Sequence, residues 1–456
     1  MSLDKTPASH GEWTVNKKVL FRFAFIFLLL LSLPLDYKFY VKLFSAPWLS
    51  LHITDLLALA SYQPDYFSEF EKTPWSLASY ASWGLSLLIA VAGTILWTCY
   101  EQKNKKLTNI SYSSLYYWLR VVLRYRLGIA LIAYGAIKLF PLQMPFPSLS
   151  NLHTNYGDFL PWKIYFHTVG VAPNYESFLG FVEVVAGVLL FFRNKVSFGT
   201  GIILGFIGNV LFANFSYEIG GHVLASYIVL VAIFLFAHDI PRLYSLLARE
   251  KPTPAERFTP DFSKPWLKNL RLALKGGVFL LTALFIFSAF YNFSTAPYLL
   301  PKGKGLNNSF GFYNVKHFVL NGDTLPYSRT NINRWQNVIF EKWPTISIKT
   351  ARPVRVDYSI VQAGIVNDVD RIYESAGVGD RRYFSYTIDS VNNSLHLRNK
   401  NNPMKEEVFH LTFSRPAETT IILKGINENK DSITAYLERI DRKYMLIEGR
   451  RKPVKL

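Results

Sequence analysis

Cysteine is almost absent from this sequence. The 456 residues include one, Cys99, so the chain can form no intramolecular disulfide, no thiol relay and no cysteine-based metal or haem site. The sequence also contains no glycine-rich dinucleotide fingerprint. Any domain outside the cytoplasm must therefore be stabilised by its own packed core.

Acidic residues are scarce relative to basic ones. The chain has 50 Lys and Arg against 32 Asp and Glu, which gives a formal net charge of +18. The excess comes from basic loops between apolar runs and from a basic C-terminal tail that ends in Arg450, Arg451, Lys452 and Lys455. Such a surface can lie against anionic lipid headgroups, where each nearby Lys or Arg contributes about 1 kcal/mol. We expect the lipid bilayer, and not nucleic acid, as the partner of these charges.

Long apolar runs are abundant, and they predict a polytopic α-helical membrane protein with about seven spans. Each run is close to the roughly 20 residues needed to cross a bilayer. The predicted spans are 19–36, 76–100, 115–140, 177–192, 197–214, 222–238 and 271–291.

Loop charge predicts the orientation of these spans, because loops rich in Lys and Arg stay in the cytoplasm. Fifteen Lys and Arg lie in the N-terminal segment and in alternate loops, whereas the intervening loops hold four. The N-terminus is therefore expected inside and the C-terminal tail outside. Lys17, Lys18 and Arg22 before the first run could instead mark a cleaved secretory signal, but no small-residue cleavage site follows closely.

The tail from about residue 295 changes to short runs in which apolar and polar residues alternate, a pattern typical of strands. Eight short strands joined by tight turns predict one closed antiparallel barrel or a sandwich. The turns are expected at Asn392-Asn393, Arg415-Pro416 and 427–431. The strands are expected at Thr345–Lys349, Arg355–Val361, Tyr383–Asp389, Leu395–Arg398, Val408–Phe413, Thr419–Lys424, Ile433–Arg439 and Tyr444–Glu448.

The interior of this predicted barrel has two interpretations. Gly311-Phe312-Tyr313 followed by Trp335 resembles the start of a lipocalin-like barrel, and a barrel of this size can hold one small apolar ligand or be filled by side chains. We favour the filled interior.

Polar side chains inside the spans are the candidate functional residues, because a polar group in hydrocarbon is costly unless it has a partner. With about 1.5 Å of rise per residue, all of them fall in the outer third of the membrane. This layering predicts a polar pocket that opens to the external side. The candidates are Glu183, Lys138 and His222 as acid, base or proton-transfer groups, and Tyr134, Asn209 and Asn214 as ligand-binding groups.

Each candidate also has a structural interpretation. Lys138 could extend to the membrane interface, Asn209 and Asn214 could join neighbouring helices, and His222 could be an ordinary interfacial histidine. We expect Glu183 to be functional, because a lone carboxylate at this depth must find a cation or lose its charge.

Other features of the spans are assigned to packing and to lipid contact. The glycines at 201, 205 and 208 form a stripe at the spacing that lets helices approach closely. Arg120, Arg124 and Arg126 gather near the cytoplasmic end of the third span, where contact with lipid headgroups explains them.

Two long external loops complete the membrane region. The loop 37–75 is expected to contain an amphipathic helix near 48–61 that lies on the external surface and roofs the polar pocket. The loop 141–176 is expected to form the other half of this roof. Its histidines, His153 and His167, are too far apart in sequence to predict a metal site.

The segment from Arg126 through His238 resembles the DoxX-like family of four-helix membrane proteins. The matching pieces are Arg126-x-Gly128 and Gly135-x-x-Lys138 in one helix, Gly180-x-x-Glu183-Val184-x-x-Gly187-x-Leu189-Leu190-x-x-Arg193 in the next, Asn209 in the third and His222 at the start of the fourth. With its extra helices and β-rich tail, the chain is similar to DoxX-like proteins of Bacteroidetes-type bacteria. The implied domains are 1–110 with two spans, 111–245 as the four-helix core, 246–270 as a cytoplasmic linker, 271–294 as the seventh span and 295–456 as the β-rich domain.

The resemblance implies a bacterial inner-membrane protein with a periplasmic C-terminal domain and, in some relatives, quinone-coupled oxidation. A quinone is the cofactor that this would require, with Glu183 accepting a proton, Lys138 and His222 assisting, and Tyr134 and Asn209 hydrogen-bonding the quinone carbonyls. The alternative is a non-enzymatic carrier or assembly factor whose β domain binds a lipid, a redox partner or an exported protein. A transporter is disfavoured, because the sequence shows no inverted repeat and no pair of broken helices.

Overall fold

The chain folds into two compact units. The helical unit comprises Met1–Leu139 and Phe178–Phe290, and the barrel unit comprises Phe140–Ser177 and Tyr291–Leu456. The predicted division differs, because it kept the loop 141–176 with the four-helix core. The computed structural model describes residues 13–46, 48, 53–67, 77–103, 111–254, 258, 260, 265–295, 299–358, 370–401 and 406–450.

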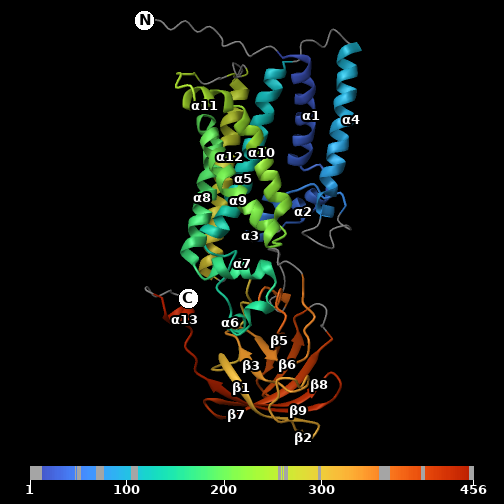
Figure 1. The fold of residues 1–456 in the computed structure, drawn as a ribbon, viewed down its shortest axis with the longest axis vertical. Coiled ribbons are helices and arrows are strands. Elements are labelled where there is room, and N and C mark those ends of the chain that lie inside the picture. The colour runs from blue at the N-terminus through green and yellow to red at the C-terminus, as the bar shows by residue number, and fades with distance from the viewer. Residues whose placement is uncertain are drawn as a thin grey trace. The chain divides into compact units, whose positions relative to one another are not determined.

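The helical unit contains a helix over each of the seven predicted spans, and the long helices run alongside one another (Figure 1). The helices that enter this unit are α1 Val15–Ser32, α2 Tyr37–Ser45, α3 Ile53–Ala60, α4 Ala81–Lys103, α5 Tyr112–Leu139, α8 Pro173–Phe191, α9 Val196–Ser216, α10 His222–Ala237, α11 Ile240–Leu247 and α12 Pro265–Thr295. Their hydrophobic contacts join helices from α1 to α10, since Phe21, Leu123, Leu190, Ile203 and Val231 belong to one buried cluster.

Five of the described helical segments are long and apolar enough to span a membrane, or six if α10 and α11 are one span bent by 61°. The chain is therefore a multi-pass membrane protein by length and composition. The predicted third span corresponds to α5, which has 28 residues but carries Arg120, Arg124, Arg126 and Lys138. These charges keep α5 below the apolarity of the other spans. The five segments are Val15–Ser45, Leu77–Lys103, Pro173–Phe191, Arg193–Ser216 and Pro265–Thr295.

Two of the arginines of α5 bind protein groups, so their assignment to lipid headgroups was wrong. Arg124 is buried and donates to the backbone oxygens of Leu190 and Phe191 at 2.9 and 3.2 Å. These are the last carbonyls of α8, where a cation also offsets the negative end of the helix dipole. Arg126 donates to the backbone oxygens of Ala60 and Tyr62, both at 2.5 Å.

Helix α3 does not lie on the surface, as the predicted amphipathic helix would. Ile53, Leu56 and Leu57 are buried, and α3 packs against α5. Arg126 binds the carbonyls that the C-terminal end of α3 leaves without helical partners. The part of the prediction at residues 49–52 lies outside the described residues.

The barrel unit contains a closed eight-stranded antiparallel barrel. Strand β1 pairs with β3, and from β3 to β9 each strand pairs with the next one in the chain. The pairing of β1 with β9 closes the barrel, while the short β2 extends one end of β1. The strands are β1 Gly311–Leu320, β2 Asp323–Thr324, β3 Asn337–Phe340, β4 Thr345–Lys349, β5 Arg382–Asp389, β6 Ser394–Asn399, β7 Val408–Ala417, β8 Thr420–Asn427 and β9 Ser432–Ile440 (Figure 1).

The barrel interior is filled with apolar side chains. Strands β6, β8 and β9 alternate buried and more exposed residues, as the two-residue period of a strand requires. In β1 a register shift between Val315 and His317 returns Phe318 to the interior, which is the effect of a β-bulge. Trp335, Phe384 and Phe409 pack on one another at the centre, within one contiguous buried cluster. This supports the filled interior over a ligand-holding one.

Six of the eight predicted strands are present with small shifts at their ends. The prediction at 444–448 was wrong, because Met445–Glu448 is the short helix α13. At Arg355–Val361, residues 355–358 form no strand and the rest lie outside the described residues. The Arg415-Pro416 turn was also misplaced, because β7 continues through Ala417 with a register shift. The strands β1, β2 and β3 were missed.

The segment between α5 and α8 belongs to the barrel unit and packs on the barrel. It contains α6 Leu149–Leu152, a short 3-10 turn at Tyr156–Asp158 and α7 Pro161–Gly170. An isolated bridge joins Phe159 to Val378. This cover explains why β4 and the first half of β5 are buried on both faces, unlike an open barrel wall.

Candidate functional site

Helices α5 and α8 approach each other closely because glycines face one another at two levels. A Cβ atom on Gly135 would lie 2.9 Å from the backbone oxygen of Gly180, and one on Gly187 would lie 2.9 Å from the oxygen of Gly128. Such distances leave no room for side chains, so backbone meets backbone. These four glycines therefore bring the two helices together beside Lys138 and Glu183.

Lys138 and Glu183 form a buried ion pair at this crossing. Lys138 Nζ donates to Glu183 Oε1 at 2.5 Å, and the two residues are 8% and 2% exposed. Side chains tilt toward the N-terminus of their own helix, so in two antiparallel helices these two tilt toward each other. Lys138 thus turns to Glu183 and does not extend outward to the interface.

The second carboxylate oxygen of Glu183, Oε2, is buried and accepts no hydrogen bond from the described residues. A buried acceptor without a donor costs about 1–3 kcal/mol. Tyr134 lies within electrostatic range of Glu183 and of Arg126, and its hydroxyl hydrogen-bonds Ser61. Glu183 and Lys138 therefore form a buried polar pair inside the helical unit, and Tyr134 lies within electrostatic range of its carboxylate.

His222 belongs to a different set of contacts. Its Nε2 lies 2.7 Å from Ser79 Oγ, and its ring contacts the rings of Tyr80 and Phe215. Tyr80 also hydrogen-bonds Ser226 at 2.6 Å. These contacts join the start of α4 to the start of α10, and none of them includes Lys138 or Glu183.

Neither asparagine lies in the predicted pocket. Asn214 accepts from the backbone N–H of Gly221 at 3.0 Å and donates to the backbone oxygen of Val210 at 2.8 Å. It therefore fixes the turn between α9 and α10. Asn209 is exposed on α9 and faces away from the buried cluster. Of the six predicted site residues, the structure brings Lys138 and Glu183 into contact and places Tyr134 within electrostatic range of Glu183.

A second group of buried charges lies in the barrel unit, where no functional residue was predicted. Glu374 and Lys400 form an ion pair at 2.6 Å, and both side chains are fully buried. Thr345 Oγ1 donates to Glu374 Oε1 at 2.7 Å and Trp343 Nε1 donates to Oε2 at 2.6 Å. Both carboxylate oxygens therefore have partners.

A second buried carboxylate, that of Glu341, binds the segment between α5 and α8 to the barrel. Glu341 accepts from the backbone N–H and hydroxyl of Ser150 at 2.7 and 2.6 Å and from the N–H of Leu149 at 3.3 Å. Burial, and then the charge of Glu374, raise the pKa of Glu341 to about 7. Ser150 also meets Ser347 of β4 at 2.8 Å. Helix α6 is thus fixed to strands β3 and β4.

Lys163 of α7 is fully buried as well. Its Nζ donates to the backbone oxygen of Tyr373 and lies 3.8 Å from the centre of the Tyr373 ring. Burial lowers the pKa of Lys163 to about 7. His153 stacks on Phe312 at 4.0 Å, and burial lowers its pKa to about 4. His167 lies against Phe159, so the two histidines have separate environments.

Sequence reasoning missed this group because nothing local marks it. Thr345 and Ser347 alternate with Ile346 and Ile348, the pattern of a strand with a solvated face. Glu374 and Lys400 lie between strands, where charged residues are usually solvated. Among the described residues no set of three or more His, Cys, Asp or Glu is placed to hold a metal ion.

Comparison with protein-family models, with curated proteins and with solved structures finds no match for this chain.

Proposed function

We propose that this protein is a DoxX-like component of a bacterial inner membrane, in which Glu183 exchanges a proton with a membrane-soluble quinone. The proposal rests on the buried Lys138–Glu183 ion pair, in which Oε2 of Glu183 has no hydrogen-bond donor among the described residues. An unpaired carboxylate oxygen in a membrane helix accepts a proton or a hydroxyl hydrogen bond readily, because it has no other donor to lose.

The residues present fit one polar end of a quinone. Glu183 Oε2 offers an acceptor, and Tyr134 offers a nearby hydroxyl. The Lys138 ammonium offsets the carboxylate charge when the proton leaves. A quinone would supply a two-electron couple, with a partner protein exchanging the electrons. Asn209, Asn214 and His222 are removed from this role by their observed positions.

The proposed orientation follows from the loop charges. Fifteen Lys and Arg lie in the segments assigned to the cytoplasm and four in those assigned to the outside, which places the N-terminus in the cytoplasm. On this topology the barrel unit is periplasmic, and α5 and α8 bring Lys138 and Glu183 to the outer half of the bilayer.

The test compares Glu183→Gln with a matched variant, Glu101→Gln. Glu101 is also a helix carboxylate that forms an ion pair, with Arg22 of α1. Each protein is purified in mild detergent, and its quinone content is measured by mass spectrometry and ultraviolet absorption. We expect near-stoichiometric quinone in the wild type and in Glu101→Gln, and at least a tenfold loss in Glu183→Gln. Equal quinone content in all three proteins, or none in the wild type, contradicts the proposal.

The filled barrel favours a second candidate function, a non-enzymatic assembly factor or carrier whose barrel is a docking module. A barrel whose interior is occupied by Trp335, Phe384 and Phe409 offers a partner its outer surface and not a ligand cavity. This candidate requires no quinone.

Photo-crosslinking at Val391 tests the docking function. Val391 is 89% exposed at the turn between β5 and β6, and a photoreactive residue there reports contacts of that end of the barrel. One discrete protein adduct in cells, together with a quinone-free wild type, favours docking. Lys316, exposed on β1, is the control position for nonspecific adducts.

A further inference from the structure

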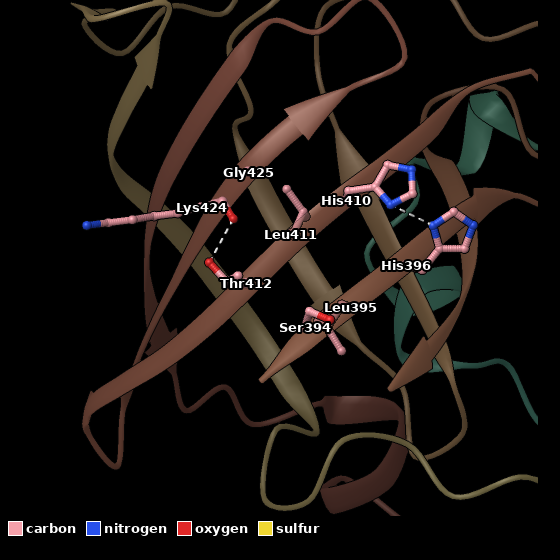
Figure 2. A pocket seen from close by; sticks show the side chains of 8 residues that line it. All are labelled: Ser394, Leu395, His396, His410, Leu411, Thr412, Lys424 and Gly425. Carbon is pink, nitrogen blue, oxygen red and sulfur yellow. Dashed lines mark hydrogen bonds between the residues drawn. The ribbon is translucent and has the colours of Figure 1, made fainter. Parts of the chain in front are cut away.

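Two histidines lie side by side on the outer wall of the barrel. They line a shallow pocket of about 350 Å³ over strands β6, β7 and β8 (Figure 2). The pocket is open to solvent and is separate from the buried charges described above. The residues that line it are Ser394, Leu395, His396, His410, Leu411, Thr412, Lys424 and Gly425.

Strand register creates the histidine pair. His396 of β6 lies directly opposite His410 of β7, and both are exposed. The flanking residues Leu395, Leu397 and Leu411 point into the barrel core, so the alternation of strand side chains points both imidazoles outward. Directly opposed side chains in antiparallel strands are near enough to bind one ion.

The distance between the two rings matches that of two ligands on one metal ion. His396 Nδ1 and His410 Nδ1 are 3.0 Å apart, and the ring centres are 4.4 Å apart. With metal–nitrogen bonds of about 2.0–2.1 Å, two neighbouring ligands are separated by about 2.9 Å at a right angle and about 3.4 Å at a tetrahedral angle. The observed separation lies between these values, without movement of the backbone.

The charges around the pocket are positive, so they do not attract a cation. Binding of a metal ion there must come from coordination by the imidazole rings. Lys424 lines the pocket, and Arg398 lies near His396. Partial burial, then His410 and then Arg398 lower the pKa of His396, which favours the neutral ring that donates a lone pair. None of the described residues that line the pocket carries a carboxylate. Imidazole donors without carboxylates suit copper, nickel or zinc and disfavour calcium and magnesium.

We propose that His396 and His410 form a two-imidazole site for a divalent transition-metal ion on the barrel surface. The ion would bind both Nδ1 atoms and replace the hydrogen bond between the two rings. Its other coordination positions face the pocket that contains Ser394, Thr412 and Lys424, where water or a donor from a second molecule completes the shell. The inference does not depend on the proposed quinone function.

Metal titration of the full-length protein in detergent tests the site. Cu²⁺, Ni²⁺ and Zn²⁺ are titrated separately at neutral pH into wild type, His396→Gln, His410→Gln and His317→Gln. His317 is the matched control, because it is an exposed barrel histidine whose ring meets Tyr436 and, within the described part of the chain, no second histidine. We expect at least a tenfold rise in Kd in each pocket variant, no change in His317→Gln, and the tightest binding for Cu²⁺.

Stoichiometry and spectroscopy separate this site from adventitious binding. The wild type should bind one more ion per chain than either pocket variant, and its Cu²⁺ resonance spectrum should show two nitrogen ligands. Binding that is equal in all four proteins is adventitious and overturns the proposal. A spectrum with one nitrogen ligand also overturns it.

A measurement on the unaltered protein keeps the test independent of variant folding. Diethyl pyrocarbonate modifies exposed histidines, and the modified positions are identified by mass spectrometry. Added Zn²⁺ should protect His396 and His410 at least fivefold and leave His317 unprotected. Equal modification of His396 with and without metal overturns the site, whatever the variants show.

Discussion

The two units each bury a Lys–Glu pair, and they surround the pair differently. Lys138–Glu183 in the helical unit and Lys400–Glu374 in the barrel unit have similar separations, 2.5 and 2.6 Å, and similar burial. Glu374 receives further hydrogen bonds at both oxygens. Glu183 leaves Oε2 without a donor among the described residues.

This difference separates a structural pair from a candidate functional one. A buried pair whose lone pairs are all satisfied holds its surroundings in one arrangement, and removal of either partner leaves an uncompensated charge. A pair with an open acceptor retains the capacity to bind a proton or a ligand. We therefore expect loss of the barrel pair to affect mainly stability and loss of the membrane pair to affect mainly binding.

The largest expected effect is on the barrel pair. Lys400→Met leaves Glu374 buried without its cation and should destabilise the barrel unit by about 3–5 kcal/mol. Hydrogen exchange of β4 and β5, followed by mass spectrometry, measures the loss. The double variant Glu374→Gln with Lys400→Met should cost less than Lys400→Met alone. A loss below about 1 kcal/mol in the single variant would show that the pair is solvated.

The next largest effect is expected on the pH dependence of stability, through the buried Lys163. The folded pKa of about 7 lies below the usual 10.5, so the unfolded chain binds more protons between these values, and stability rises with pH there. One pH unit corresponds to about 1.4 kcal/mol. Between pH 7 and about pH 9.5, the free energy of unfolding of wild type should therefore rise by about 3 kcal/mol relative to that of Lys163→Met. Denaturant unfolding of the barrel unit at each pH gives the difference. The control variant Lys304→Met removes an exposed lysine and should show the same dependence of stability on pH as wild type. If wild type and Lys163→Met also show the same dependence, the lowered pKa of Lys163 is contradicted.

The smallest effect is expected for the membrane pair. A double-mutant cycle with Lys138→Met and Glu183→Gln should give a coupling energy of about 1 kcal/mol, because polar groups of helices separated in the membrane also find partners. Unfolding in mixed detergent micelles measures the four proteins. A coupling as large as that of Lys400 and Glu374 would erase the contrast between the two pairs.

Local sequence patterns predicted most of the architecture. Apolar runs located every long helix, and period-two alternation located six strands within a few residues. Strand β3 was missed because Asn337–Phe340 ends in three consecutive buried apolar residues, so it shows no alternation. The pattern of residues 444–448 predicted a strand. Helix α13 forms there instead, because β9 already closes the barrel on β1.

The site was predicted in part. Glu183 and Lys138 stand out because a charge in an apolar run is conspicuous, and their spacing from Gly135 and Gly180 reflects the helix crossing that joins them. The stripe at 201, 205 and 208 has the same composition, yet a Cβ atom on Gly205 or Gly208 would meet nothing within 4 Å. Small residues permit close approach, but the partner helix decides whether it occurs.

The sequence by itself determined the membrane helices, the strand-rich tail and the membrane carboxylate, because each depends on composition and period within one segment. Only the tertiary structure decided that the loop after α5 covers the barrel, that Glu374 and Lys400 are buried, and that His396 meets His410. The physical reason is that burial and strand pairing depend on residues distant in the chain. Ser150 reaches Glu341 across 191 positions, a distance over which no local pattern carries information.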